Sequence, residues 1–292
     1  MPVHEKLWQD IAWGGVSLQL PADWQPSIIH KSYLFFEHEG NPAFAIRWEK
    51  IRGSFSAEKI LHRMRKSFKH GSAALEQWDR QDELQEKYNK FSITAYTWHD
   101  DGGKGKGLLL YCSDCSRATL IQLYEKDSRE KGIVDHILDT YCDHPSGPEQ
   151  EWSIFDIRAL LPINAELQSH EFLAGRYTLS FLLNSSTLTL YRFKPSAAIL
   201  LHQSIREFGS SLADGAPLVE KGSDEEAYWE FRASGLQKLA VRLRRKPGWI
   251  WLKLKELKEH NAILAVKASG KDKMDEKIVE HITDHFVIRK YS

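Results

Sequence analysis

The feature that most constrains the fold is a long stretch that occurs twice in the chain. Trp13 to Phe68 and Trp152 to Phe208 each run from a tryptophan through a short apolar segment to a proline, Pro21 or Pro162. Each stretch then contains two further strand-like segments and ends in a related pattern, Ile60-Leu61-His62…Phe68 against Leu200-Leu201-His202…Phe208. A chain of 292 residues is long enough for two domains with separate cores. We therefore expect two duplicated domains, residues 1–146 and 147–292.

The later part of each copy supports the same boundary. Ile278-Val279-Glu280-His281-Ile282 matches Ile133-Val134-Asp135-His136-Ile137 almost residue for residue. The cluster His144-Pro-Ser-Gly-Pro148 between the copies has the composition of a linker. Duplication with a short linker is the organisation that the sequence predicts.

Local patterns favour an α+β fold class. Residues 15–20 alternate apolar and polar side chains, which is the period of a half-buried strand. Glu39–Pro42 predicts a hairpin turn, and a second turn is expected at the Gly/Lys run Gly102–Gly107. Ile60, Leu61, Met64 and Phe68 have the spacing of a helix stripe. We expect each domain to be an antiparallel sheet covered by helices.

The opening of the first copy resembles the PsbP-like fold. The resemblance rests on the order of elements and on Leu20-Pro21-Ala22-Asp23-Trp24, which becomes Leu161-Pro162-Ile163-Asn164-Ala165 in the second copy, without the tryptophan. Photosystem accessory proteins and a Ran-binding import factor family share that fold. The resemblance implies a PsbP-like sandwich in tandem and a binding or accessory role rather than catalysis.

Composition narrows the class of protein. Lys+Arg and Asp+Glu both number 40, which argues against bulk electrostatic binding to nucleic acid or membrane. No apolar run reaches the roughly 18–20 residues of a membrane helix. The start MPVHEKLWQDIAW lacks the pattern of a signal peptide, and three cysteines cannot form a disulfide framework. We expect a cytoplasmic protein without a membrane partner.

A candidate metal site is the most specific constellation. Cys112, Cys115, Cys142 and His144 offer thiolate and imidazole ligands, and zinc prefers four such ligands in a tetrahedron. The Cys112-Ser-Asp-Cys115 segment is expected to form a turn between strands, and Cys142 and His144 follow a predicted helix. The alternative is three ordinary cysteines around a polar turn. The cofactor expectation is therefore none, or a structural zinc ion.

A basic and aromatic segment is the second candidate. Read as a hairpin over residues 238–258, it places one set of residues on the face away from the core: Arg242, Arg244, Trp249, Trp251, Lys253 and Lys255. Basic groups interleaved with aromatic rings can bind single-stranded nucleic acid. The acidic run at 220–230 could instead neutralise these charges, and the tryptophans could pack against protein.

These observations favour a non-enzymatic binding or accessory protein. We expect it to act on an unknown protein or small ligand through a site near the domain junction, where binding sites concentrate. The alternatives are a zinc-stabilised protein, a single-stranded nucleic-acid-binding protein using the hairpin, and an enzyme whose cleft is not visible in sequence. The sequence contains no GxSxG, HExxH or GxGxxG motif.

Overall fold

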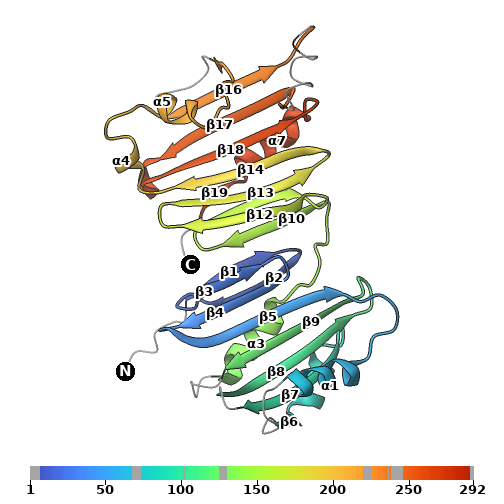
Figure 1. The fold of residues 1–292 in the computed structure, drawn as a ribbon. Coiled ribbons are helices and arrows are strands. Elements are labelled where there is room, and N and C mark those ends of the chain that lie inside the picture. The colour runs from blue at the N-terminus through green and yellow to red at the C-terminus, as the bar shows by residue number, and fades with distance from the viewer. Residues whose placement is uncertain are drawn as a thin grey trace. The chain divides into compact units, whose positions relative to one another are not determined.

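The computed structural model describes residues 7–67, 74–100, 103–124, 130–219, 225–235, 237 and 246–289. These residues divide into two compact units (Figure 1). Unit 1 holds the described residues up to Ser146 together with Ser153–Phe155, and unit 2 holds Gly147–Trp152 and Asp156–Arg289. Each unit contains its own seven-stranded sheet. The two sites discussed below each lie within a single unit.

The sheet of unit 1 has the strand order β3-β4-β5-β9-β8-β7-β6, with antiparallel neighbours throughout. Its strands are β3 (Gln25–His30), β4 (Tyr33–His38), β5 (Asn41–Lys50), β6 (Ala74–Gln77), β7 (Ser92–Asp100), β8 (Gly103–Cys112) and β9 (Arg117–Tyr124). The strands β1 (Trp8–Trp13) and β2 (Val16–Pro21) precede this sheet and form an antiparallel hairpin that belongs to another, five-stranded sheet. The described helices of this unit are α1 (Ala57–Ser67), α2 (Gln81–Lys87) and α3 (Glu130–Thr140).

The sheet of unit 2 has the order β12-β13-β14-β18-β17-β16-β15. Its strands are β12 (Glu166–Leu173), β13 (Arg176–Leu183), β14 (Ser186–Phe193), β15 (Leu218–Val219), β16 (Glu226–Arg232), β17 (Trp249–Leu257) and β18 (Ala262–Gly270). The remaining elements are β10 (Glu149–Ile154), β11 (Ile157–Pro162), β19 (Val287–Ile288), α4 (Ser196–Ile199), α5 (Ile205–Ser210), α7 (Glu276–Asp284) and the 3-10 turn η1 (Lys258–His260). Followed along the chain, the strands take the same positions in both sheets.

The expected α+β sandwich with helix-covered sheets is wrong. Strands make up 52% of the structure and helices 19%, so the protein is mostly antiparallel β. The strands β5 and β8 each extend over ten residues, whereas α4 and α5 have only four and six. Helices of that length bury too few side chains to cover a seven-stranded sheet.

The second copy of the repeated helix pattern shows where the prediction failed. The match to Ile60–Phe68 predicts one helix that includes Leu200, Leu201 and His202. In the structure these residues lie between α4 and α5, and Leu201 is 69% exposed. Ser204 begins a new helix here. Its hydroxyl accepts a hydrogen bond from the Glu207 backbone N–H, and the Glu207 carboxylate accepts one from the Ser204 N–H. This capping box marks the beginning of a helix, which the spacing of apolar residues alone does not indicate.

The Gly/Lys run also differs from expectation, because Gly103–Gly107 is part of β8 rather than a turn. Gly105 lies opposite Trp98 of β7, and Gly107 lies opposite Tyr96. A Cβ atom on Gly107 would lie 2.1 Å from the Tyr96 ring, which is buried at 2% exposure. The large rings of β7 thus occupy the space that side chains of β8 would otherwise fill.

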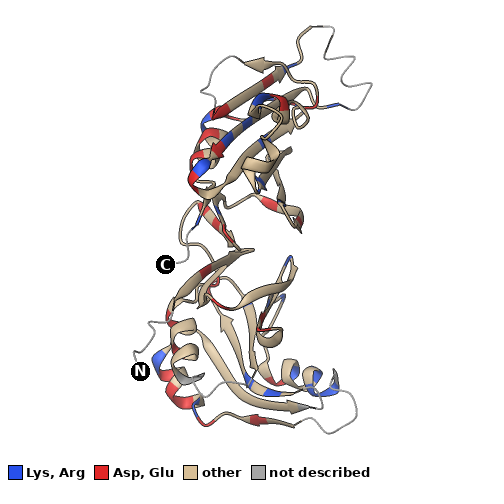
Figure 2. Ribbon diagram, turned by 90° about the vertical axis from the view of Figure 1, so that its left-hand side faces the viewer, with Lys and Arg blue, Asp and Glu red and all other residues tan. Residues whose placement is uncertain are grey.

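Charged residues of both signs are distributed over both units. Figure 2 shows Lys and Arg interspersed with Asp and Glu rather than gathered in one band. In unit 2 the pairs include Lys267 with Asp214 at 2.6 Å and Arg176 with Glu171 at 2.5 Å. The described surface therefore lacks the single-sign field that would attract a polyanion.

The core of unit 2 predicts an unusual response to a glycine substitution. Gly209 of α5 faces Trp229, which is 1% exposed, and a Cβ on Gly209 would lie 2.1 Å from the indole ring. Alanine for glycine in a helix normally stabilises by about 0.5–1 kcal/mol, but overpacking a core costs about 1–3 kcal/mol. We expect Gly209→Ala to lower the free energy of unfolding by about 1–3 kcal/mol in urea titrations.

Gly132 of α3 provides the matched control. It is exposed, and a Cβ added there would meet no atom within 4 Å. Gly132→Ala is expected to raise the free energy of unfolding by up to about 1 kcal/mol. A neutral or stabilising Gly209→Ala variant would contradict the packing described for Trp229.

Candidate metal centre

The turn between β8 and β9 supplies two thiols. Cys112 is the last residue of β8 and pairs with Arg117, the first residue of β9. The four residues between them include Cys115, and Ser116 has a left-handed backbone with φ of 56°. This turn brings Cys115 back toward Cys112. Cys112 is buried and Cys115 is half-buried.

The segment after α3 supplies the other two groups. Tyr141 is 1% exposed, and its hydroxyl donates a 2.6 Å hydrogen bond to Thr119 of β9. Cys142 then forms an isolated antiparallel bridge with Ser17 of β2, through two backbone hydrogen bonds of 2.8 Å. Successive side chains of extended backbone point to opposite sides. The side chain of Asp143 therefore points inward toward the turn, and that of Cys142 points outward.

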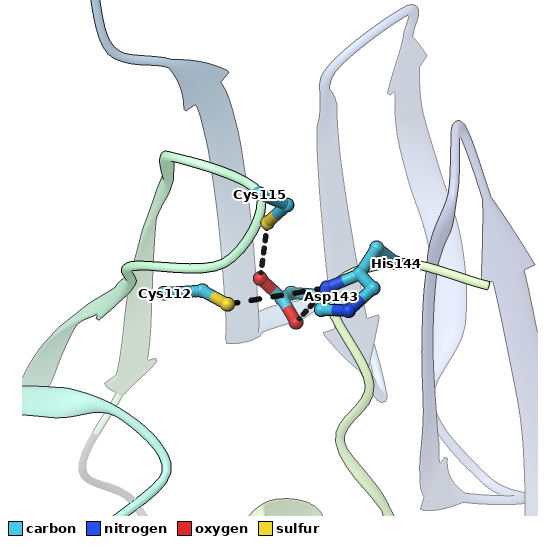
Figure 3. A group of neighbouring side chains, drawn as sticks. All are labelled: Cys112, Cys115, Asp143 and His144. Carbon is cyan, nitrogen blue, oxygen red and sulfur yellow. Dashed lines mark hydrogen bonds and ion pairs between the residues drawn. The ribbon is translucent and has the colours of Figure 1, made fainter. Parts of the chain in front are cut away.

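Four donor groups converge between these two segments (Figure 3). Their ligand atoms, from Cys112, Cys115, Asp143 and His144, all lie within 4.8 Å of one another. The Cys115 thiol donates to the Asp143 carboxylate at 2.9 Å, and His144 Nδ1 lies 2.8 Å from the other oxygen of that carboxylate. Cys112 Sγ lies 4.0 Å from the same His144 nitrogen.

Burial and one cation define the electrostatics of the cluster. Asp143 is 4% exposed, and Arg117 donates to its backbone carbonyl oxygen and to that of Gly15 at 3.0 Å. Burial, with the hydrogen bond to Asp143, raises the pKa of the Cys115 thiol to about 12. A metal ion would replace the thiol protons and neutralise the buried carboxylate, since a coordinated thiol is deprotonated.

The donor set fits zinc. Two sulfurs, one imidazole nitrogen and one carboxylate oxygen are ligands that zinc accepts in a tetrahedron. Ligand atoms in such a tetrahedron are roughly 3.3–3.8 Å apart, given metal–ligand distances of about 2.0–2.3 Å. The cluster already has this scale, with a largest spacing below 4.8 Å. A closure of about 1 Å would complete the coordination.

The structure brings together three of the four ligands expected from sequence. Cys112, Cys115 and His144 meet, but Cys142 does not belong to the cluster. Its thiol is exposed and donates to the carbonyl oxygen of His144 at 2.9 Å. Asp143 takes its place, and sequence reasoning missed it. Asp143 lies between Cys142 and His144, the two predicted ligands. The alternation of side chains along an extended segment could have indicated that Asp143, and not Cys142, faces the turn.

The basic and aromatic segment is described only in part, and the two tryptophans of that part are buried rather than exposed. Arg242 and Arg244 lie outside the described residues. Trp249 and Trp251 are 1% and 2% exposed, so neither indole presents a face on which a base could stack. The first half of the expected hairpin, residues 238–245, also lies outside the described residues, and the second half, β17, pairs with β16 on one side and β18 on the other.

The two lysines of that set lie close to acidic residues. Lys253 and Lys255 lie 3.4 Å and 3.5 Å from the carboxylate oxygens of Glu226 on the neighbouring strand. Lys258 pairs similarly with Glu225 at 2.8 Å. Neutralisation by the preceding acidic segment is the alternative that the sequence left open.

Within the described part of the chain, no helix is both long enough and apolar enough to cross a bilayer.

Comparisons with known proteins give little for the chain as a whole. No protein-family model matches it, and no curated protein matches it. A solved structure from Bacteroides thetaiotaomicron VPI-5482 is similar, with 13% sequence identity and a TM-score of 0.31. The match covers 54% of this chain and 53% of that chain, so the chain spans about half the length of that protein. The PsbP-like resemblance has no family match behind it.

Proposed function

We propose that this chain is a non-enzymatic accessory protein whose unit 1 binds one structural zinc ion. The observation that carries the proposal is the convergence of Cys112, Cys115, Asp143 and His144 within 4.8 Å. The donors come from two segments far apart in sequence, the β8–β9 turn and the residues after α3. A bound ion would join these segments directly.

The number of protein donors favours a structural role over a catalytic one. Catalytic zinc keeps one coordination position open for water or substrate, whereas a structural site fills all four with protein. Here four side chains surround one point, and two of them, Cys112 and Asp143, are buried. Two thiolates with an imidazole also select zinc over magnesium or calcium, which prefer oxygen ligands.

The test is the metal content of the full chain purified without chelator. We expect one zinc ion per chain by elemental analysis, and a thiolate-to-metal charge-transfer band after substitution with cobalt(II). Cys115→Ser and Asp143→Ala should each weaken zinc binding by more than the roughly 10- to 100-fold that loss of an outer hydrogen-bond partner costs.

Cys142→Ser is the matched control, because the exposed Cys142 thiol lies outside the cluster. This variant should retain zinc with unchanged affinity. Metal-free protein, or loss of zinc in Cys142→Ser together with retention in Asp143→Ala, would refute the proposed ligand set. A circular dichroism spectrum of each variant separates loss of a ligand from loss of the fold.

A further inference from the structure

Unit 2 contains a pocket of about 210 Å³ at one end of β17 and β18. Its walls come from β16, β17, β18 and the segment that leaves α7. Four of the lining residues are charged: Glu226, Lys253, Lys255 and Asp284. The others are Leu257, Leu264, Val266, Thr283, Phe286 and Val287. The pocket therefore has an apolar wall and a charged rim, the usual combination in small-molecule sites.

The pocket takes the place in unit 2 that the metal cluster takes in unit 1. Leu257 closes β17 opposite Ala262, just as Cys112 closes β8 opposite Arg117. Val287 follows the helix and pairs with β11, as Cys142 pairs with β2. In unit 1 this region holds thiols, but in unit 2 it holds aliphatic side chains beside an open volume. The equivalent regions of the two units therefore differ in chemistry.

The positive and negative charges around the pocket lie on different walls. Two ammonium groups, from Lys253 and Lys255, share the single carboxylate of Glu226 at 3.4 Å and 3.5 Å. Together, Lys253, Lys255 and Glu226 carry a net positive charge. Asp284, the last residue of α7, contributes a negative charge from another wall. A ligand with one charge would leave one of these two regions without a counter-charge, whereas a zwitterion would complement both.

We propose that this pocket binds a free aliphatic α-amino acid. Its carboxylate would contact Lys253 and Lys255, and its ammonium group would contact Asp284. Its side chain would lie against Leu264, Val266 and Phe286, which are 6%, 2% and 4% exposed and so form a fixed apolar wall. A cavity needs only roughly 10–15 Å³ to hold one water molecule. The pocket volume of about 210 Å³ is therefore large enough to admit a small organic molecule such as leucine.

The test is a ligand-observed NMR titration of the full chain with three probes that share the isobutyl group of leucine. L-leucine carries both charges, 4-methylpentanoate lacks the ammonium group, and 3-methylbutylamine lacks the carboxylate. We expect leucine to bind at least 10-fold more tightly than either singly charged probe, because each of those probes lacks one charged group and its hydrogen bonds to the pocket.

Variants of exposed residues assign the two ends of the ligand. Lys255→Met should weaken leucine binding by about 10- to 100-fold, and Asp284→Asn should do so while leaving 4-methylpentanoate binding unchanged. Lys267→Met is the control, since Lys267 alternates to the opposite face of the same sheet and pairs with Asp214. Absence of leucine binding up to its solubility limit, equal affinity for 4-methylpentanoate, or an unaffected Asp284→Asn variant would overturn the proposal.

Discussion

Replacing Asp156 by alanine is expected to lower the free energy of unfolding of unit 2 by about 3 kcal/mol. The Asp156 carboxylate accepts hydrogen bonds from Arg192 at 2.5 Å and from Lys194 at 2.6 Å. The Arg192 side chain is only 10% exposed, and its guanidinium lies 4.2 Å from the centroid of the Tyr177 ring. Alanine would leave this buried cation without its counter-ion. Lys194, at 27% exposure, keeps part of its hydration, which moderates the loss.

The same cluster gives the stability of unit 2 a defined dependence on pH. Burial acts to raise the pKa of Asp156, but the hydrogen bonds and charges of Arg192 and Lys194 outweigh it and hold the pKa below its usual value. The stabilisation is therefore complete above the unfolded-state pKa of about 3.9 and is lost as pH falls through the lower folded-state pKa. The difference between wild type and Asp156→Ala should shrink below about pH 4.

Denaturant unfolding at neutral and acid pH measures both effects. Glu171 is the control, because it pairs with Arg176 at 2.5 Å in the same unit but both side chains are about half exposed. Glu171→Ala should cost less than about 1 kcal/mol, since water screens an exposed pair. Equal losses in the two variants, or a pH-independent difference for Asp156→Ala, would show that burial does not strengthen the Asp156 cluster.

Removing the proposed zinc ion from the full chain is expected to destabilise unit 1 selectively. A bond between Cys115 and Asp143 through the metal would close a loop that contains β9 and α3, with a sequence separation of 28. Closing a loop of that length removes about 3–4 kcal/mol of chain entropy from the unfolded state, by the relation used for disulfides. The metal-free protein should lose stability on that scale.

Hydrogen exchange with and without chelator resolves the effect by element. Amides of β9 and α3 should exchange faster after chelation, while those of β17 and β18 in unit 2 act as an internal reference. Cys142→Ser should behave as wild type in both states. Unchanged protection of α3 on chelation would mean that the cluster does not join the two segments.

The sequence indicates which types of side chain meet at the candidate site, but it does not identify all four residues. Residue types and spacing singled out Cys112, Cys115 and His144, which the structure brings together, because a clustering of thiols with an imidazole is informative. The choice between Cys142 and Asp143 depends on a single backbone bridge to Ser17, which is 125 positions away in sequence. Whether Cys142 or Asp143 faces the cluster depends on the direction in which each side chain of this extended segment points. Tertiary contacts set that direction.

The alternation of side chains along a strand was easier to predict than the burial of each face of the strand. The period of β17 puts Ile250, Leu252 and Leu254 on one face of the strand, and all three lie in the core. It also placed Trp249 and Trp251 outward, but both are buried, because this part of the sheet is packed on both faces. A period of two distinguishes two faces of a strand but does not tell whether the second face meets water.

The ring of Tyr96 lying over Gly107 has a consequence for how this sequence can diverge. The Tyr96 ring of β7 fills the space that a side chain at position 107 of β8 would occupy. A tyrosine at 96 therefore requires a glycine at 107. A side chain added at 107 requires a smaller residue at 96, and truncation at 96 leaves a void unless 107 grows. The two positions are therefore free to change only together, and they mark the β7–β8 register for anyone aligning distant sequences to this sheet.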